Sequence, residues 1–353
     1  MAVGGPTLAQ LIDPRTREGA LWEPLAGGRL RCVACGHRCV VLPGQRGVCK
    51  VRYNQEGRLR VPWGYVAGVQ LDPIEKKPFF HAYPGAKALS FGMLGCDLHC
   101  AYCQNALTSQ ALRDPAMGVP PRDVIPADVV SAARRGGARV LTSTYNEPLI
   151  TAEWGVEIFR TGKVAGLVGS FVSNGNATPE ALDYLRPWVE LYKVDLKAFR
   201  DRSYRQLGGL LRTILDSIQG IHARGFWLEI VTLVIPGLND DEGELREAAA
   251  FIAGVSPDIP WHVTAFHPDY RMDDRGRTPA RTLTRAAEIG LAAGLRHVYA
   301  GNLPGRVGPF EDTRCPGCGR AVVRRLGFRV LDRRIGPDGR CEGCHVVIAG
   351  RWD

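Results

Sequence analysis

Residues 88–105 read ALSFGMLGCDLHCAYCQN, an apolar run that leads directly into three closely spaced cysteines. The run 88–94 is short and uncharged, which is typical of a buried β-strand. Cys96, Cys100 and Cys103 follow it at once, so their thiols are expected at the carboxyl end of that strand. Parallel α/β domains carry their chemistry at this end of their strands. The stretch therefore predicts a cysteine-bearing functional loop on an α/β domain.

Strand-like and helical segments alternate after this stretch. The apolar, strand-like runs are 88–94, 138–144, 169–174, 191–196, 227–235 and 260–266, with 297–302 as a candidate seventh. Helical patterns occupy 126–136, 151–163, 179–187, 240–255 and 279–294. Six or seven such alternations predict a parallel α/β domain, which is a full or partial barrel or a doubly wound sheet.

The chain of 353 residues divides into three segments. Residues 1–85 form a cysteine-rich module, 86–305 the α/β domain and 306–353 a small cysteine-rich tail. A composition that is 45% hydrophobic and 23% charged excludes a disordered or collagen-like chain. The net charge of +9 lies in the two outer segments, whereas the α/β domain is nearly neutral. The outer segments therefore face an acidic partner, such as RNA or DNA, or form a solvated surface.

The eleven cysteines indicate metal chemistry. No apolar run approaches the ~20 residues of a membrane-spanning helix, and no secretory signal begins the chain. We expect a cytoplasmic protein with no membrane partner, whose thiols stay reduced. The cysteines fall into three groups at metal-ligand spacing: Cys32, Cys35, Cys39 and Cys49; Cys96, Cys100 and Cys103; and Cys315, Cys318, Cys341 and Cys344.

The central group has three members, and that number is informative. Three thiolates at this spacing can wrap one face of a [4Fe–4S] cluster, which normally takes four ligands. One iron is then left open for a small chelating ligand. A zinc site and three unrelated buried thiols are the alternatives.

CDLHCAYC resembles the C-x3-C-x2-C signature of the radical S-adenosylmethionine (SAM) superfamily, including the aromatic Tyr102 before the third cysteine. The resemblance implies a partial (β/α)6 barrel of the TIM type, in which the open iron chelates the amino and carboxylate groups of SAM. It also implies reductive cleavage of SAM to a 5′-deoxyadenosyl radical, which abstracts hydrogen from the substrate. A reducing donor of the flavodoxin or ferredoxin type would supply the electron.

Polar residues follow the other strand-like runs. Asp195 and Lys197 lie on the same side of a strand, since side chains alternate, and buried charges need a partner or a ligand. By themselves, Asn146-Glu147 could cap a helix and Asn174-Gly175 could be a turn. The resemblance gives these positions roles toward SAM: Asn146 and Glu147 at its amino group, Ser173, Asn174 and His267 near its ribose, and Lys197 at its carboxylate, with Asp195 near the active site.

The two outer cysteine groups predict structural or auxiliary metals. The tail spacing C-x2-C-x22-C-x2-C favours a zinc-ribbon-like structural site over a redox or iron–sulfur site. Cys341-Glu-Gly-Cys344-His345 also fits a haem-attachment pattern, but covalent haem requires export. The first group can hold zinc, an auxiliary [4Fe–4S] cluster or a rubredoxin-like iron.

The whole-chain layout resembles the radical SAM enzymes of the AmmeMemoRadiSam system, which are related to pyruvate formate-lyase activating enzymes. The resemblance rests on the N-terminal cysteine group, DPIEKKPFFHAYPG, CDLHCAYCQN, TYNEP, DLKAF, FHPDY and the CPGC…CEGC tail. It implies a protein substrate, glycyl-radical-activase-like hydrogen abstraction and Memo-like and AMMECR-like partners.

Two other functions are open at this point. Radical modification of RNA or of a small molecule is one, motivated by tail arginines that could bind phosphate: Arg314, Arg320, Arg324, Arg325, Arg329, Arg333 and Arg334. A non-catalytic iron–sulfur and zinc scaffold is the other. Charges such as Glu147, Asp195 and Lys197 argue against a scaffold, which has no use for them inside a barrel.

Overall fold

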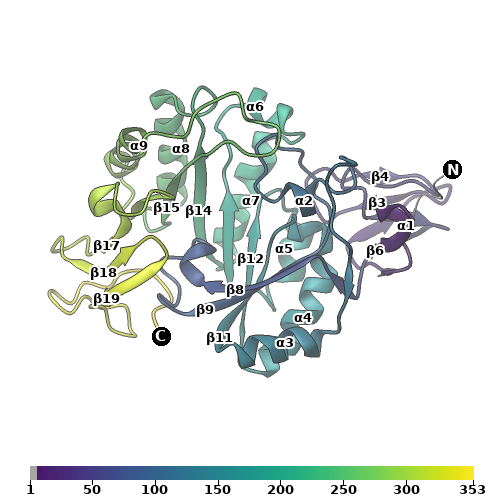
Figure 1. Ribbon diagram of the computed structural model, residues 1–353, viewed down its shortest axis with the longest axis horizontal. Helices are drawn as coiled ribbons and strands as arrows, with labels where there is room; N and C mark the ends of the chain where they lie inside the picture. Colours follow the sequence, from purple (N-terminus) through teal and green to yellow (C-terminus); the bar gives the residue numbers. More distant parts are fainter. Residues whose placement is uncertain (1–5) are drawn as a thin grey trace.

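The computed structural model describes residues 6–353, and an eight-stranded sheet forms its centre. Seven of its strands run parallel in the order in which they occur along the chain (Figure 1). They are β9 (Lys87–Gly92), β11 (Ala138–Ser143), β12 (Val168–Ser173), β13 (Leu191–Asp195), β14 (Trp227–Val234), β15 (Trp261–Ala265) and β16 (Val298–Gly301). The predicted α/β fold is confirmed, including the candidate seventh strand.

One antiparallel strand forms the edge of the sheet beside β9. β8 (Gly68–Pro73) pairs with β9, so a strand from the first 85 residues extends the central sheet. β8 and β16 are the two edges and do not pair with each other, so the sheet is open, as a partial barrel is. A 3-10 turn, η1 (Ile74–Lys76), follows β8.

Helices connect the parallel strands at all five expected places. They are α3 (Pro126–Arg135), α4 (Ala152–Val164), α5 (Pro179–Leu185), α8 (Glu242–Val255) and α9 (Ala280–Ala292), with η2 (Pro148–Thr151) before α4. Side-chain caps fix two of the starts: Thr178 accepts from the N–H of Ala181 at 3.1 Å, and Asp241 from that of Glu244 at 3.0 Å.

Two further helices, α6 (Asp201–Gln206) and α7 (Leu211–Ala223), lie between β13 and β14. The sequence interpretation did not include them. Ile214, Ile218 and Ile221 recur on one face of α7 and are buried, which is the signal that predicts such a helix. Within residues 6–353, no helix has both the length and the apolar content needed to cross a bilayer.

The N-terminal module packs beside the loop that follows β9. It contains α1 (Leu8–Ile12), the sheet of β1 (Thr16–Glu18), β6 (Arg58–Pro62) and β5 (Tyr53–Gln55), and the sheet of β2 (Trp22–Pro24), β3 (Leu30–Cys32) and β4 (Val40–Val41). β7 (Tyr65–Val66) pairs with β10 (Arg122–Asp123), and α2 (Ala106–Ser109) follows the cysteine loop. A buried ion pair joins module and barrel: both Arg52 amino groups donate to Glu153 at 2.7 Å.

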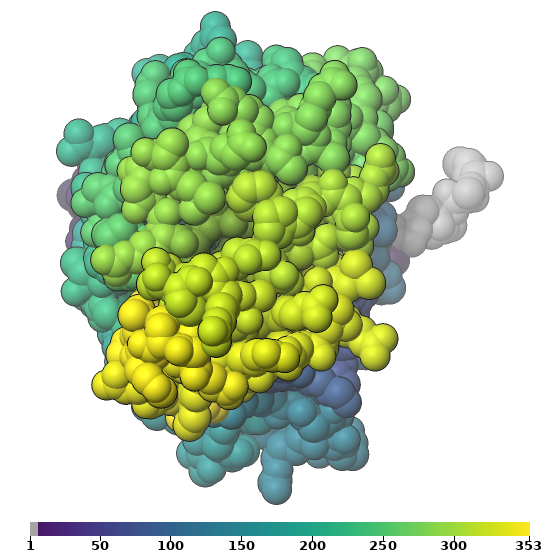
Figure 2. Space-filling view, turned by 90° about the vertical axis from the view of Figure 1, so that its left-hand side faces the viewer, coloured from purple at the N-terminus to yellow at the C-terminus, as the bar shows by residue number. Residues whose placement is uncertain are grey.

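The C-terminal module lies on the opposite side of the barrel domain (Figure 1) and forms part of the continuous surface seen in Figure 2. It contains η3 (Gly308–Glu311), β17 (Thr313–Arg314), β18 (Ala321–Leu326) and β19 (Arg329–Arg333). Arg325 anchors it, donating to Thr313 Oγ1 at 2.8 Å and to the carbonyl of Phe80 at 2.7 Å. Because Arg325 is buried, it is not available to bind phosphate on the surface.

Candidate functional site

A cavity of about 410 Å³ opens within the barrel, a size typical of small-ligand sites. Cys96, Cys100 and Cys103 line it together. Residues expected at SAM also line it, namely Tyr102, Asn146, Glu147, Asn174, Asp195 and Lys197. Most of the strand-end residues that the sequence singled out therefore meet in one place, whereas Ser173 and His267 are not among the lining residues.

The loop after β9 turns at a glycine that no other residue could replace without strain. Gly95 has φ +96°, and a Cβ there would lie 2.9 Å from Val51 Cγ1 and 3.2 Å from the carbonyl oxygen of Cys49. The chain thus passes close to the N-terminal module before it presents Cys96 to the cavity. Such close backbone approach with positive φ is where glycine is required.

The three central cysteines fit a cluster with an open position. All three are free thiols that face one cavity, and they share an apolar setting with Leu98 and Phe266. The N–H of Leu98 donates to Cys96 Sγ at 3.4 Å, and Cys103 Sγ lies 3.0 Å from Ser109 Oγ. Hydrogen bonds to sulfur stabilise a bound thiolate. This donor set suits a [4Fe–4S] cluster held by three thiolates.

Glu147 is a buried carboxylate fixed by neighbouring strand ends. Its oxygens accept from Ser173 Oγ at 2.7 Å, from the N–H of Asn174 at 2.8 Å and from the N–H of Leu149 at 3.1 Å. Burial, and next the negative charge of Asp97, raise the pKa of Glu147 to about 8. A carboxylate in this setting favours a cationic ligand such as an ammonium group.

Asp195 and Lys197 lie on the same side of the chain, as the period-two argument predicts. Lys197 Nζ is 3.4 Å from Asp195 Oδ2, and Lys193 Nζ donates to Asp195 Oδ1. Burial lowers the pKa of Lys197 while the Asp195 carboxylate raises it, and the second effect prevails. Lys193 was missed, although the same alternation that pairs Asp195 with Lys197 also brings Lys193 to this side.

Tyr102 and His267 occupy different settings. Tyr102 is buried in the cavity wall, and its hydroxyl has no hydrogen-bond partner within residues 6–353. His267 is half-buried at the rim: its Nε2 lies 3.3 Å from Nε2 of Gln104, which itself lines the cavity. Asn146 accepts from the N–H of Met93 at 3.0 Å, which fixes the end of β11 to that of β9.

The part of the cavity farther along the barrel interior was not predicted from the sequence. Lys77 and Phe80, from the segment after η1, line it together with Lys193, His262 and Tyr299. The segment 74–82 folds back against the barrel, where the N–H groups of Phe80 and His81 each donate to Glu229 at 2.9 Å. Only the tertiary fold brings Lys77 and Phe80 to the site.

The N-terminal cysteines lie next to the central ones. His37 Nε2 is 3.2 Å from the carbonyl oxygen of Asp97, whose carboxylate accepts from Asn174 Nδ2 at 2.6 Å and from Asn176 Nδ2 at 2.8 Å. Arg113 joins the two loops, donating to the carbonyl of Leu98 at 3.0 Å and to that of Val48 at 2.7 Å. Three thiols of this group are buried and the fourth is half-buried: Cys32, Cys35, Cys49 and Cys39.

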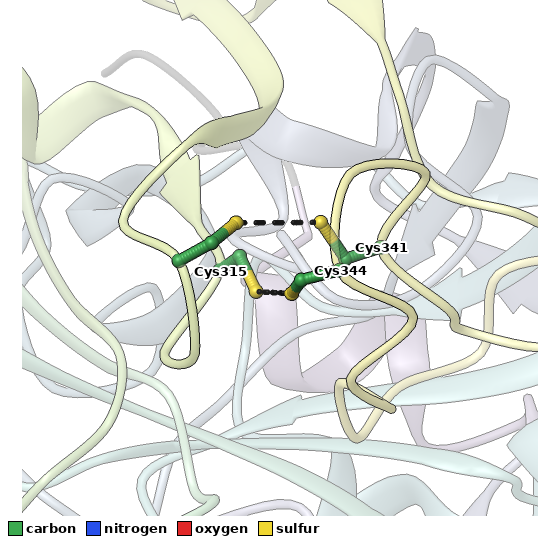
Figure 3. A group of neighbouring side chains, drawn as sticks. Cys315, Cys341 and Cys344 are labelled. Carbon is green, nitrogen blue, oxygen red and sulfur yellow. Dashed lines mark hydrogen bonds between the residues drawn. The ribbon is translucent and has the colours of Figure 1, made fainter.

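The C-terminal cysteines form a compact metal-ligand set (Figure 3). Their four Sγ atoms all lie within 4.8 Å of one another, and the pairs Cys315–Cys344 and Cys318–Cys341 are 3.4 and 3.8 Å apart. A tetrahedral ion with bonds to sulfur of about 2.3 Å separates its ligands by about 3.8 Å. The group can therefore hold one metal ion. It is the only such convergence of metal-ligating side chains in residues 6–353.

A family model described as the radical SAM superfamily matches residues 92–249, which contain the three-cysteine loop, Glu147 and Asp195. The chain belongs to this superfamily. It is also 32% identical over 335 residues to an uncharacterized protein, MJ0808, of Methanocaldococcus jannaschii. This match covers 94% of this chain and 98% of MJ0808. The relationship thus extends beyond the radical SAM barrel over nearly the whole chain.

Solved structures of radical SAM proteins resemble the chain more distantly. A domain of pyruvate-formate lyase-activating enzyme from Bacteroides vulgatus is 22% identical, with a TM-score of 0.41, over 46% of this chain and 98% of that one. A radical SAM methyltransferase from Sphaerobacter thermophilus is 19% identical, with a TM-score of 0.46, over 62% of this chain and 68% of that one.

Proposed function

We propose that this radical SAM protein cleaves SAM reductively and abstracts a hydrogen atom from a protein substrate, as glycyl-radical activases do. One arrangement carries the proposal: three free thiols and the buried Glu147 carboxylate line the same cavity. When bound to Cys96, Cys100 and Cys103, a [4Fe–4S] cluster would keep one iron open and supply the electron that breaks the SAM sulfonium bond.

The residues around the cavity then have distinct tasks toward SAM. Glu147 accepts the ammonium group and is aimed by Ser173 and Asn174, which donate to its two oxygens. Lys197 binds the carboxylate, and Asp195 holds Lys197 in place. Fixing both charged ends of the amino-acid moiety orients the sulfonium before reaction, so little reorganisation is needed.

The finer features of the proposal come from the layout of the chain. We infer that it acts within an AmmeMemoRadiSam system, with Memo-like and AMMECR-like partners and an electron donor of the flavodoxin or ferredoxin type. Zinc suits the C-terminal cysteines because their sulfurs converge to the spacing of a single tetrahedral ion. The N-terminal cysteines would hold zinc or an auxiliary [4Fe–4S] cluster.

The test is anaerobic reconstitution with iron and sulfide, followed by addition of dithionite and SAM and quantification of 5′-deoxyadenosine by chromatography. The wild-type protein should form 5′-deoxyadenosine. Cys100→Ala should form none and should bind less iron. A protein that holds its cluster and forms no 5′-deoxyadenosine would contradict the proposal.

A further inference from the structure

Two buried lysines line the barrel cavity in addition to the residues expected to meet SAM. Lys193 and Lys77 are only 4% and 5% exposed, and both line the cavity. Lys193 precedes Asp195 by two residues on β13, so its backbone lies about 6.6 Å farther down the strand. Lys77 Nζ donates to Asp72 Oδ2 at 2.8 Å and to the Tyr145 hydroxyl at 3.3 Å.

Each lysine shares its carboxylate with a second lysine. Asp72 forms ion pairs with both Lys76 and Lys77, and Lys76 Nζ lies 2.9 Å from Asp72 Oδ1. Asp195 likewise forms ion pairs with both Lys193 and Lys197. One carboxylate therefore serves two ammonium groups on each wall of the cavity. A buried ammonium group without a counter-charge of its own is costly unless a ligand supplies that charge.

The other carboxylates of the cavity region are engaged elsewhere. Glu147 is held by the neutral donors described above. Glu75 receives the N–H of Gly85 at 2.9 Å and lies 3.7 Å from Arg325. Within the described residues neither forms an ion pair with Lys77 or Lys193.

Glu229 neighbours Lys193 across β13 and β14 but is also satisfied. Besides the N–H groups of Phe80 and His81, it accepts from Trp227 Nε1 at 3.0 Å and from His262 Nε2 at 2.7 Å. Four hydrogen bonds use both of its oxygens.

We propose that this part of the cavity, whose cationic side chains include Lys77 and Lys193, binds an oxyanion, a carboxylate or phosphate group, carried by the substrate. The inference rests on the proposed function, since it concerns the substrate of the same site. In the proposed function, Lys197 and Glu147 bind SAM. Lys77 and Lys193 have no role toward SAM and are therefore available to bind the substrate. The anion would fix one end of the substrate inside the barrel and hold the rest toward the cysteine loop.

The surrounding side chains strengthen such binding. Phe80 packs edge-on against His262 with ring centres 4.8 Å apart, and His262 stacks on Tyr299 at 5.0 Å. These rings exclude water from one wall, and ionic attraction grows as water is excluded. Burial lowers the pKa of both Lys77 and Lys193, and a bound anion would oppose that effect.

The test measures anion binding without turnover. The full-length protein, reconstituted with its cluster and saturated with SAM but not reduced, is titrated by calorimetry with inorganic phosphate and with succinate at constant ionic strength. We expect saturable binding of one molecule per chain for at least one anion. Lys77→Met and Lys193→Met should each weaken it at least tenfold. Lys87→Met, at an exposed lysine on β9, should change it less than twofold.

The two anions distinguish a phosphate from a carboxylate ligand, and circular dichroism verifies the fold of each variant. If Lys193→Met does not fold, Lys77→Met, which lies outside the barrel strands, still decides the result. The inference is overturned if the wild-type protein binds neither anion saturably or if Lys77→Met binds as tightly as wild type. A wild-type protein that binds an anion but forms no 5′-deoxyadenosine would instead overturn the proposed function alone.

Discussion

The two cysteine-rich modules have the same number of cysteines but are built differently. The C-terminal module has its own small core, in which Val322, Val323 and Trp352 pack around Cys315 and Cys341. In the N-terminal module, Cys32 and Cys49 belong to the main core of the barrel. The C-terminal thiols converge within 4.8 Å, and the N-terminal thiols do not.

This difference separates a self-contained module that could hold its own metal ion from a module that extends the region of the candidate site. A small core of few residues needs a metal or similar cross-link to stay folded. The N-terminal cysteines instead lie where Gly95, Asp97 and Arg113 connect them to the central cysteine loop. We therefore expect a substitution at the C-terminal cysteines to have only local effects. A substitution at the N-terminal cysteines should also affect the cluster held by the central cysteines.

The largest expected effect is loss of the C-terminal metal. Structural zinc contributes an apparent ~10–16 kcal/mol to the domains that it folds. Cys341→Ser should release zinc and remove hydrogen-exchange protection across 306–353, while the barrel strands stay protected. Cys49→Ser should instead lower protection in the loop 95–110 and reduce the iron content. Identical protection patterns in the two variants would refute the distinction.

The buried arginines that anchor the modules give the next effect. Arg52→Met leaves Glu153 as an unpaired buried charge, which should lower the free energy of unfolding by about 3–5 kcal/mol. The double change Arg52→Met with Glu153→Gln should recover part of the loss. Arg325→Met removes hydrogen bonds to two neutral acceptors and also leaves the buried Glu75, 3.7 Å from Arg325, without its cationic partner, so it should likewise lower the free energy of unfolding by about 3–5 kcal/mol. Denaturant titrations measure all three variants, and a loss of less than about 1 kcal/mol for either arginine would contradict the account.

The pH dependence of SAM binding tests the proposed role of Glu147. Because Glu147 ionises with a pKa of about 8, SAM affinity should rise about 50-fold between pH 6 and pH 8. In the same protein without SAM, the pKa of Glu147 is higher in the folded state than in the unfolded state. The free energy of unfolding should therefore fall as the pH rises from about 4.5 to about 8. Equilibrium binding at each pH checks the first statement, and Glu147→Gln should remove both dependences.

The smallest effect is expected at Arg113, which crosses between the N-terminal module and the cysteine loop. Arg113→Met should lower the free energy of unfolding by only about 1 kcal/mol, because two partly exposed hydrogen bonds are lost. The reconstituted cluster should nevertheless lose iron faster under a chelator. Lys163→Met, at a surface lysine on α4, is the control. Equal rates of iron loss in both variants would show that the bridge does not matter to the cluster.

Local sequence patterns predicted the fold and part of the site. The apolar runs gave the parallel strands, and cysteine spacing gave the central loop and the C-terminal quartet. Glu147, Asp195 and Lys197 followed from their places at strand ends. These features could be predicted because each depends on a few residues that are neighbours in the sequence.

Contacts between distant segments were not predictable in this way. Lys77 and Phe80 come from a proline-containing segment with no periodic pattern, and they reach the cavity only because the chain folds back against the barrel at Glu229. The approach of His37 to Asp97 depends likewise on how the N-terminal module docks. Lys193 is different: it was missed, although alternation along β13 would have been sufficient to find it.

The central claim is that three thiolates hold a cluster whose open iron binds SAM. Electron paramagnetic resonance of the dithionite-reduced protein, with and without SAM, tests it most directly. The account predicts a cluster signal that changes when SAM is added, is absent in Cys100→Ala and persists in Cys341→Ser. A signal that ignores SAM, or a SAM-responsive signal that survives Cys100→Ala, would contradict the account.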